Sequence, residues 1–277
     1  MVAKKVVNVA HRGASGYAPE NTLAAFDVAI GLGADVIEFD LRMTADGALL
    51  VFHDPQLGRT TRPKRNRALV ADVTLEQVRG LSAGSWFNQR FPWHAREEFE
   101  SERIPTLEEI LVRYAGSIGL LIDLKDPSTS PATVPRLLHV LADHGVGGPA
   151  QLGRGITVAS FCSRSLLEIR ASNEHVRLMQ LFDLCDPCGV PELQRSAGYA
   201  EAVGLWRDHL DPTLVDGAND AGLEFYSYTV NEVDDLSRAM HVRVDGVITN
   251  FPDRLARVLR QVDPQARRRP RYTSLGS

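Results

Sequence analysis

Two acidic residues, Glu38 and Asp40, stand two positions apart in the apolar stretch DVIEFDL at residues 35–41. Side chains two apart in a β-strand share a face, so both carboxylates should point to one side while the apolar residues between them point to the other. Like charges buried together repel and lose hydration, which costs several kcal/mol when no cation accompanies them. The pair therefore predicts a positive group beside it.

The same alternation assigns further polar side chains to this face. In the stretch IGLLIDLK it groups Asp123 with Lys125. In the stretch ALLVFHD it groups His53 with Leu49 and Val51. Both stretches are therefore expected to place ionisable side chains on the same side as Glu38 and Asp40.

The first apolar run, VVNVAH, ends at a histidine and is followed by an arginine. We expect these two residues to join the cluster. Three carboxylates in one site form an all-oxygen set, which suits one divalent cation, Mg²⁺ or Ca²⁺, better than zinc, with Mn²⁺ as a further candidate. The residues expected to converge are His11, Arg12, Glu38, Asp40, His53, Asp123 and Lys125.

Each of these residues also has a structural interpretation. A single histidine at a strand end is more often a hydrogen-bonded structural group, and Glu38 and Asp40 could simply form ion pairs with Arg12 and Lys125. Packing alone does not readily explain so many ionisable groups at the strand ends of one sheet. The combination favours an active site.

Short apolar runs alternate with amphipathic stretches along the whole chain, which favours repeated strand–helix units. Eight such units over about 250 residues predict an α/β fold, a TIM-type (β/α)8 barrel, with a doubly wound open sheet as the alternative. A further short run, AVGLW at 202–206, falls outside the count of eight. The candidate strands are 6–11, 35–41, 48–53, 118–125, 156–161, 176–181, 223–229 and 244–249.

Several helix ends can be read from capping residues. Asn21 is the expected cap of a helix that stops at Gly33. Thr106 and Glu109 form a capping box. The pair Asp-Pro at 211–212 opens another helix.

Two segments interrupt the regular alternation. Only residues 42–47 join the second and third candidate strands, too few for a parallel crossover, so a hairpin or an irregular corner is expected there. The segment from about 55 to 103 holds no clear strand–helix unit and predicts a small inserted cap subdomain after the third strand. The predicted organisation is one barrel over 1–264 that contains this insertion, followed by a basic, mobile tail at 265–277.

Composition limits the class of partner. The 277 residues include 31 basic and 35 acidic ones, and the net charge of −4 gives no basic footprint for nucleic acid. No apolar stretch approaches the roughly 20 residues of a membrane span, and the first apolar run is too short for a signal peptide. We therefore expect a cytoplasmic protein with a small-molecule partner and no stable membrane insertion, while the oligomeric state stays open.

A series of short motifs resembles the glycerophosphodiester phosphodiesterase family. The motifs follow one another in order from residue 10 to about 252, and this ordered series is far more specific than any single match. The matching stretches are His11-Arg12-Gly13, Pro19-Glu20-Asn21-Thr22, Glu38-x-Asp40, His53-Asp54, Arg59-Thr60-Thr61, residues 104–109 and 122–125, Ser160-Phe161, Tyr228-Thr229-Val230-Asn231 and residues 245–249.

The sequence departs from the family pattern at three positions. Asp123 stands where the family usually has Glu, which shortens the reach of one metal ligand. Tyr228 replaces the usual Trp, and Asn250 replaces the usual Asp. These changes bear on metal affinity and substrate preference more than on the reaction type.

The resemblance implies a metal-dependent hydrolase that cleaves glycerophosphodiesters to glycerol 3-phosphate and an alcohol such as choline or ethanolamine. Divalent metal and basic side chains would neutralise the phosphate as charge builds up, and two imidazoles would move protons. The implied roles are acid–base catalysis by His11 and His53, metal ligation by Glu38, Asp40 and Asp123, and phosphate binding by Arg12 and Lys125, with Glu20 and Tyr228 as substrate or structural support.

Several alternatives stay open at this point. The attacking group is either water or a neighbouring substrate hydroxyl that forms a cyclic phosphate, and either histidine could be the acid. A lysophospholipase D-like activity would need an acyl path, for which the insertion offers five aromatic residues that could equally form its own core. A catalytically silent barrel that binds a phosphate-containing ligand is a further alternative. The five residues are Trp86, Phe87, Phe91, Trp93 and Phe99.

Overall fold

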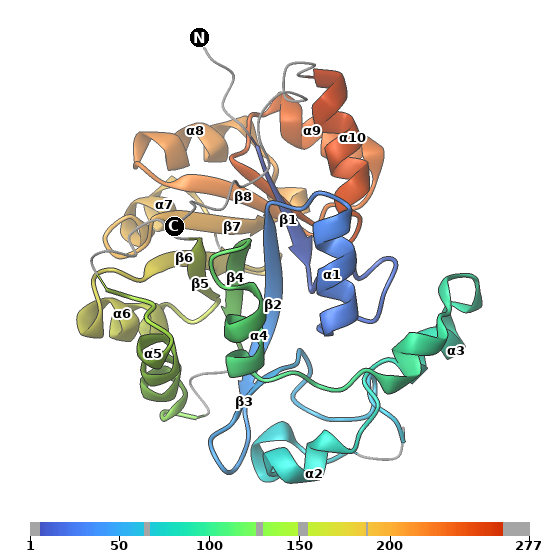
Figure 1. The fold of residues 1–277 in the computed structure, drawn as a ribbon. Helices are drawn as coiled ribbons and strands as arrows, with labels where there is room; N and C mark the ends of the chain where they lie inside the picture. Colours follow the sequence, from blue (N-terminus) through green and yellow to red (C-terminus); the bar gives the residue numbers. More distant parts are fainter. Residues whose placement is uncertain (1–5, 64–66, 126–129, 149–154, 187, 263–277) are drawn as a thin grey trace, which may run out of the picture.

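The computed structural model describes residues 6–63, 67–125, 130–148, 155–186 and 188–262. Among these residues, nine strands form one sheet, and eight of them are parallel and close into a barrel because β1 pairs with both β2 and β9 (Figure 1). The predicted TIM-type barrel is confirmed. The barrel strands are β1 (Val7–His11), β2 (Val36–Met43), β4 (Gly119–Leu124), β5 (Ile156–Ser160), β6 (Arg177–Phe182), β7 (Ala202–Trp206), β8 (Glu224–Tyr228) and β9 (Gly246–Thr249).

Helices cover the outside of the barrel, and the main hydrophobic core lies between them and the strands (Figure 1). On β2 the three residues that alternate with the carboxylates, Ile37, Phe39 and Leu41, are fully buried in this outer core, as the alternation predicted. The covering helices are α1 (Leu23–Gly31), α4 (Leu107–Tyr114), α5 (Thr133–Asp143), α6 (Ser163–Ser172), α7 (Val190–Ser196), α8 (Pro212–Asp220), α9 (Val233–His241) and α10 (Pro252–Val262).

The strand count from the sequence was wrong in two places. Strand β3 (Leu49–Val51) pairs antiparallel with β2 and is not a barrel strand, because the short turn before it allows only a hairpin. The run left out of the count is barrel strand β7, which pairs with β6 and β8. Two errors of opposite sign therefore gave the correct number of barrel strands.

One helix cap also differs from the prediction. Helix α1 is capped by Thr22, whose side chain accepts a hydrogen bond from the Ala25 N–H, and not by Asn21. Asn21 has a positive φ of 58°, and its side chain turns instead toward the barrel interior, where it binds Asp40. The capping box at Thr106 and the Asp-Pro helix start at 211–212 are confirmed.

The segment after β3 holds short helices in place of a strand–helix unit. It contains α2 (Leu75–Arg79), α3 (Ser85–Arg90) and three 3₁₀ turns at Val70–Asp72, Pro92–His94 and Glu97–Ser101, and it lies beside the end of the barrel to which β2 leads (Figure 1). The division into a barrel over 1–264 with an insertion at 55–103 stays a prediction. The tail at 265–277 lies outside the described residues.

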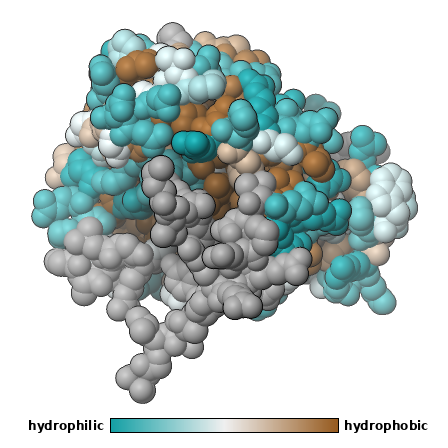
Figure 2. Space-filling view, turned by 90° about the horizontal axis from the view of Figure 1, so that it is seen from above, coloured by the Kyte–Doolittle hydropathy of each residue, from teal (hydrophilic) through white to brown (hydrophobic). Residues whose placement is uncertain are grey.

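Figure 2 shows the face of the molecule that lies opposite the segment after β3. Its described surface is mainly hydrophilic, with apolar side chains between the polar ones. None of the helices in the described ranges is long and apolar enough to cross a membrane.

Candidate active site

The three predicted metal ligands lie together inside the barrel mouth. Glu38 and Asp40 come from β2, and Asp123 comes from β4, where it is the pairing partner of Asp40. Each residue offers an oxygen that lies within 4.8 Å of the oxygens offered by the other two, and all three are buried. Among the described residues this is the one group of acidic, histidine or cysteine side chains with such a geometry.

Two cations partly compensate this negative charge. The Lys125 ammonium lies 3.1 Å from Oδ1 of Asp40 and donates a hydrogen bond to Asp123. The Arg12 Nε lies 3.1 Å from Oδ2 of Asp40, and the Arg12 backbone N–H donates to Glu38 at 2.7 Å. Burial acts to raise the pKa of Asp40, but Lys125 and Arg12 outweigh it and hold that pKa below its usual range.

The compensation is incomplete at the other two carboxylates. Burial raises the pKa of Glu38 well above its ordinary value, and the charges of Asp40 and Asp123 raise it further. Burial likewise raises the pKa of Asp123, whose Oδ1 is buried without a hydrogen-bond partner. Three hard oxygen donors with unsatisfied negative charge fit a divalent cation, and the chemistry of the set therefore agrees with a metal site.

His11 ends β1 and is in contact with an uncharged partner. Its Nδ1 lies 2.7 Å from Oδ1 of Asn250, which follows β9. Burial, and then the neighbouring charge of Arg12, lower the pKa of His11 to about 3. The imidazole is therefore neutral across the ordinary pH range, and its other nitrogen is available to the cavity.

His53 has an acidic partner, since its Nδ1 lies 2.7 Å from Oδ1 of Asp54. The reason given for its position from the sequence was wrong, because β3 ends at Val51, and Leu49 and Val51 pack in the outer core and not beside His53. His53 reaches the cavity from the segment that leaves the strand. The sequence feature that points to this contact is the acidic residue Asp54 directly after His53.

A cavity of about 290 Å³ connects these groups. One wall is aromatic and apolar and includes Phe161, Trp206 and Tyr228. The Tyr228 hydroxyl donates to the Phe182 carbonyl at 2.7 Å, so its ring rather than its oxygen faces the site, and the rings of Phe161 and Trp206 meet it edge-on. The polar side chains that line the cavity are His11, Arg12, Glu38, His53, Asp123, Lys125, Asp183 and Thr229.

Glu20 does not line this cavity but supports a residue that does. Its Oε1 accepts a hydrogen bond from Arg12 at 2.8 Å. It also accepts two hydrogen bonds from Arg59, which lies in one of the family-like motifs although no local pattern predicts a role for it. Asn21 was also missed as a site residue, because its good capping chemistry suggested a different role.

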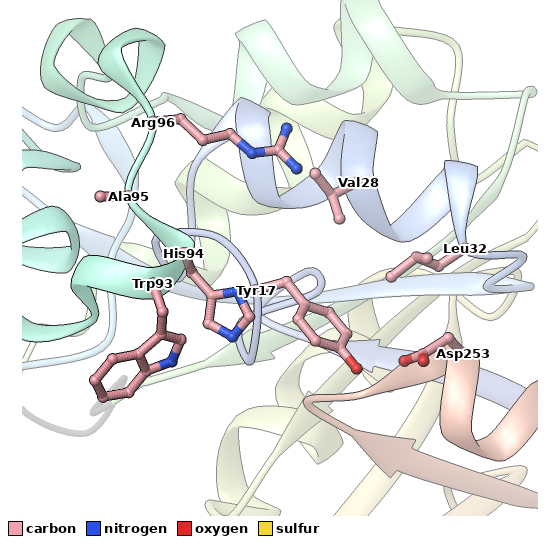
Figure 3. A pocket seen from close by; sticks show the side chains of 8 residues that line it. All are labelled: Tyr17, Val28, Leu32, Trp93, His94, Ala95, Arg96 and Asp253. Carbon is pink, nitrogen blue, oxygen red and sulfur yellow. The ribbon is translucent and has the colours of Figure 1, made fainter.

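The five aromatic residues of the insertion do not line the cavity that holds the histidines. Phe87 and Phe99 are buried, and they form a small core with Ala18 and Ala25 of the barrel. Trp93 is 75% exposed and borders a separate, shallower hollow of about 430 Å³ between the insertion, α1 and the start of α10, where the Tyr17 ring points toward Asp253 (Figure 3). The interpretation of these residues as a core is favoured over an acyl path.

A closed parallel barrel with ionisable groups at one mouth defines the class of TIM-barrel enzymes. The model of the glycerophosphoryl diester phosphodiesterase family matches residues 11–254, and the chain belongs to that family. The resemblance seen in the motifs is confirmed.

Relatives match over nearly their whole length. A glycerophosphodiester phosphodiesterase of Bacillus subtilis (strain 168) is 35% identical over 90% of this chain and 85% of its own. One from Caldanaerobacter subterraneus subsp. tengcongensis is 32% identical over 93% and 99%. Among solved structures, an Oleispira antarctica phosphodiesterase in complex with the product sn-glycerol-3-phosphate is 26% identical, covers 92% of this chain and 96% of its own, and superposes with a TM-score of 0.78.

Proposed function

We propose that this chain hydrolyses small glycerophosphodiesters to glycerol 3-phosphate and an alcohol. The observation that carries the proposal is a cavity lined by two histidines, two cations and two carboxylates, Glu38 and Asp123, which form a buried group with Asp40. Membership of the phosphodiesterase family and the product named for the Oleispira antarctica structure support the same substrate class.

Glu38, Asp40 and Asp123 would hold one divalent cation, and we propose Mg²⁺ or Ca²⁺, with Mn²⁺ as a third candidate. When bound, such a cation supplies positive charge that polarises the phosphate and stabilises negative charge as it develops. The acidic residue at position 123 is the shorter Asp, and its free Oδ1 supports its role as a ligand.

Arg12 and Lys125 would bind the phosphate oxygens. Both face the cavity, and both are held in place by the carboxylates beneath them. Neighbouring carboxylates raise the pKa of Lys125 despite its burial, so its charge is secure. Charge fixed before the substrate binds lowers the barrier because it needs no reorganisation during the reaction.

The two histidines would divide the proton transfers. His11 is neutral and its Nδ1 is engaged by Asn250, so its Nε2 is suited to accept a proton from the attacking oxygen. His53 contacts the Asp54 carboxylate through Nδ1, which orients the ring beside the cavity, and we assign to it the transfer of a proton to the leaving oxygen. Glu20 would hold Arg12, and the Tyr228 ring would support the substrate as part of the aromatic wall.

The cavity size favours a small diester over a lysophospholipid. A volume of about 290 Å³ is at the lower end for ligand pockets and suits a headgroup-sized molecule. We also propose a cytoplasmic location, which is supported by three cysteines that are all free.

The test incubates the purified protein with each substrate and measures the free alcohol together with its phosphate co-product, which is glycerol 3-phosphate for a soluble diester and an acylated glycerol phosphate for a lysophospholipid. Glycerophosphocholine, glycerophosphoethanolamine and a lysophospholipid should be compared, each with Mg²⁺, Ca²⁺ or Mn²⁺ and with a chelator. We expect chelator-sensitive release from the soluble diesters. No release under any of these conditions would refute the proposal and favour a silent phosphate-ligand binder. A diester without the neighbouring hydroxyl separates direct attack by water from a cyclic phosphate route, since only direct attack continues without that group.

A further inference from the structure

Arg59 lies between β3 and α2 and binds two carboxylates at once. Its Nε and one terminal nitrogen contact Asp54 at 2.5 and 3.0 Å. Its two terminal nitrogens contact Glu20 at 2.9 and 2.7 Å. A planar guanidinium presents its donors in a fixed fork, so this pair of two-point contacts fixes the two carboxylates relative to each other.

Each of these carboxylates in turn holds a residue of the polar cavity wall. Asp54 contacts His53 at 2.7 Å, and Glu20 accepts from Arg12 at 2.8 Å. Basic and acidic side chains thus alternate along one chain of contacts, with Arg59 at its centre. In order, the members are Arg12, Glu20, Arg59, Asp54 and His53. Arg59 itself does not line the cavity, so it can affect the reaction only through its two partners.

Exposure argues that geometry rather than bulk charge is the important property of Arg59. Its side chain is 46% exposed, and an ordinary ion pair at that exposure stabilises a protein little. Its partners Glu20 and Asp54 are only 13% and 19% exposed. Burial acts to raise the pKa of both carboxyls, but hydrogen bonds from Arg59 and from the group that each one holds keep both pKa values below their usual range.

We propose that Arg59 is a positioning residue of the reaction, which sets the orientation of His53 through Asp54 and that of Arg12 through Glu20. The inference rests on the proposed function. Under this proposal the segment after β3 not only carries His53 but also holds the two sides of the cavity mouth together. These sides come from the β1–α1 loop and from the segment that follows β3.

The test compares Arg59→Gln with Arg79→Gln. Arg79 forms an ion pair of 3.3 Å with Glu109, also between the insertion and the barrel and with similar exposure, but away from the cavity. We expect Arg59→Gln to lower kcat by roughly 10- to 100-fold, the usual scale for losing a partner of a site residue. Arg59→Lys should stay defective, because a single ammonium keeps the charge but cannot make two two-point contacts. Arg79→Gln should leave kcat unchanged.

A spectroscopic measurement separates positioning from general stability. In protein labelled with ¹⁵N-histidine, the Nδ1 resonance of His53 should change in Arg59→Gln and Arg59→Lys but not in Arg79→Gln. Unchanged kcat and an unchanged His53 resonance in folded Arg59→Gln would overturn the inference. So would an increase in KM alone with an unchanged His53 resonance, which would mean that Arg59 does not position His53, or full activity of Arg59→Lys, which would mean that charge suffices. Release of glycerol 3-phosphate by the wild type tests the proposed function separately, and the resonance reports on the Arg59 contact even where no turnover is found.

Discussion

The Nδ1 atom of His11 lies 2.7 Å from Oδ1 of Asn250, so the histidine at the end of β1 is oriented by an uncharged side chain. Burial and the adjacent charge of Arg12 already disfavour the imidazolium, and Asn250 adds no negative charge that would offset them. The other histidine, His53, has the carboxylate of Asp54 at the same distance. The two imidazoles thus have unlike partners, which is the physical basis for giving them unlike roles.

Replacing Asn250 by Asp should shift the pH dependence of the reaction. A carboxylate this close would raise the pKa of His11 from about 3 by roughly one to three units. With a raised pKa, His11 becomes protonated at a higher pH and stops accepting protons there. We expect the acidic limb of the kcat profile to move to higher pH, with activity near pH 8 retained. Asn250→Gln, which places no charge there, is the control, and an unmoved acidic limb in Asn250→Asp would contradict the role given to His11 as the base.

Loss of either imidazole should affect the chemical step. We expect His11→Ala and His53→Ala each to lower kcat by about 10² to 10⁴, the usual scale for an acid–base group. His139, which is 64% exposed and pairs with Asp143 on α5, offers a matched control in His139→Ala. Steady-state kinetics at several pH values would measure the effect. Turnover within a few-fold of wild type in either site variant would remove that histidine from the acid–base pair.

The residues that the sequence predicted well belong to regular strands. The alternation on β2 placed Glu38 and Asp40 correctly because their apolar neighbours must pack in the outer core. Asp123 followed by the same logic from β4, which runs parallel to β2 in register. Where burial on one side of a strand dictates the pattern, side-chain direction can be read from the sequence.

The residues that the sequence misplaced depend on backbone turns and distant contacts. Asn21 and Thr22 are both good capping residues, and only the positive φ of Asn21 decides that Thr22 caps the helix. His53 lies just past the end of β3, where alternation no longer applies. Arg59 reaches Glu20 across 39 residues of chain, a contact that no local pattern reports.

Metal binding should stabilise the protein through the carboxylate group. Without a cation the raised pKa values of Glu38 and Asp123 mean that folding buries charge at a cost. We expect an excess of the physiological cation to raise the Tm, by an amount equivalent to about 2.7 kcal/mol at a concentration of 100 times Kd. Glu38→Gln keeps an acceptor for the Arg12 N–H but removes one charge, so it should be at least as stable as wild type without metal and should lose most of the metal-dependent shift.

Differential scanning fluorimetry with Mg²⁺, Ca²⁺ and Mn²⁺, each against a chelator, would measure these shifts. Asp143→Asn provides a control, since Asp143 is an exposed acidic residue at the end of α5. A metal-dependent rise in Tm that is the same in Glu38→Gln as in wild type would place the cation elsewhere.

Asn21 should act as a support for Asp40. Its side-chain amide donates to Oδ2 of Asp40 at 2.8 Å, and its Oδ1 accepts from the Asp40 backbone N–H at 3.3 Å. Asn21→Gly keeps the positive φ at no steric cost but removes both contacts, which should lower the free energy of unfolding by about 1–3 kcal/mol, because a buried carboxylate loses a donor. Asn21→Ala should cost roughly a further 1–2 kcal/mol, because alanine is strained at a positive φ. Chemical denaturation measures both variants, and kcat should fall in each because Asp40 is no longer held in place. Equal stability of the glycine variant and wild type, with full activity, would show that Asp40 needs no such support.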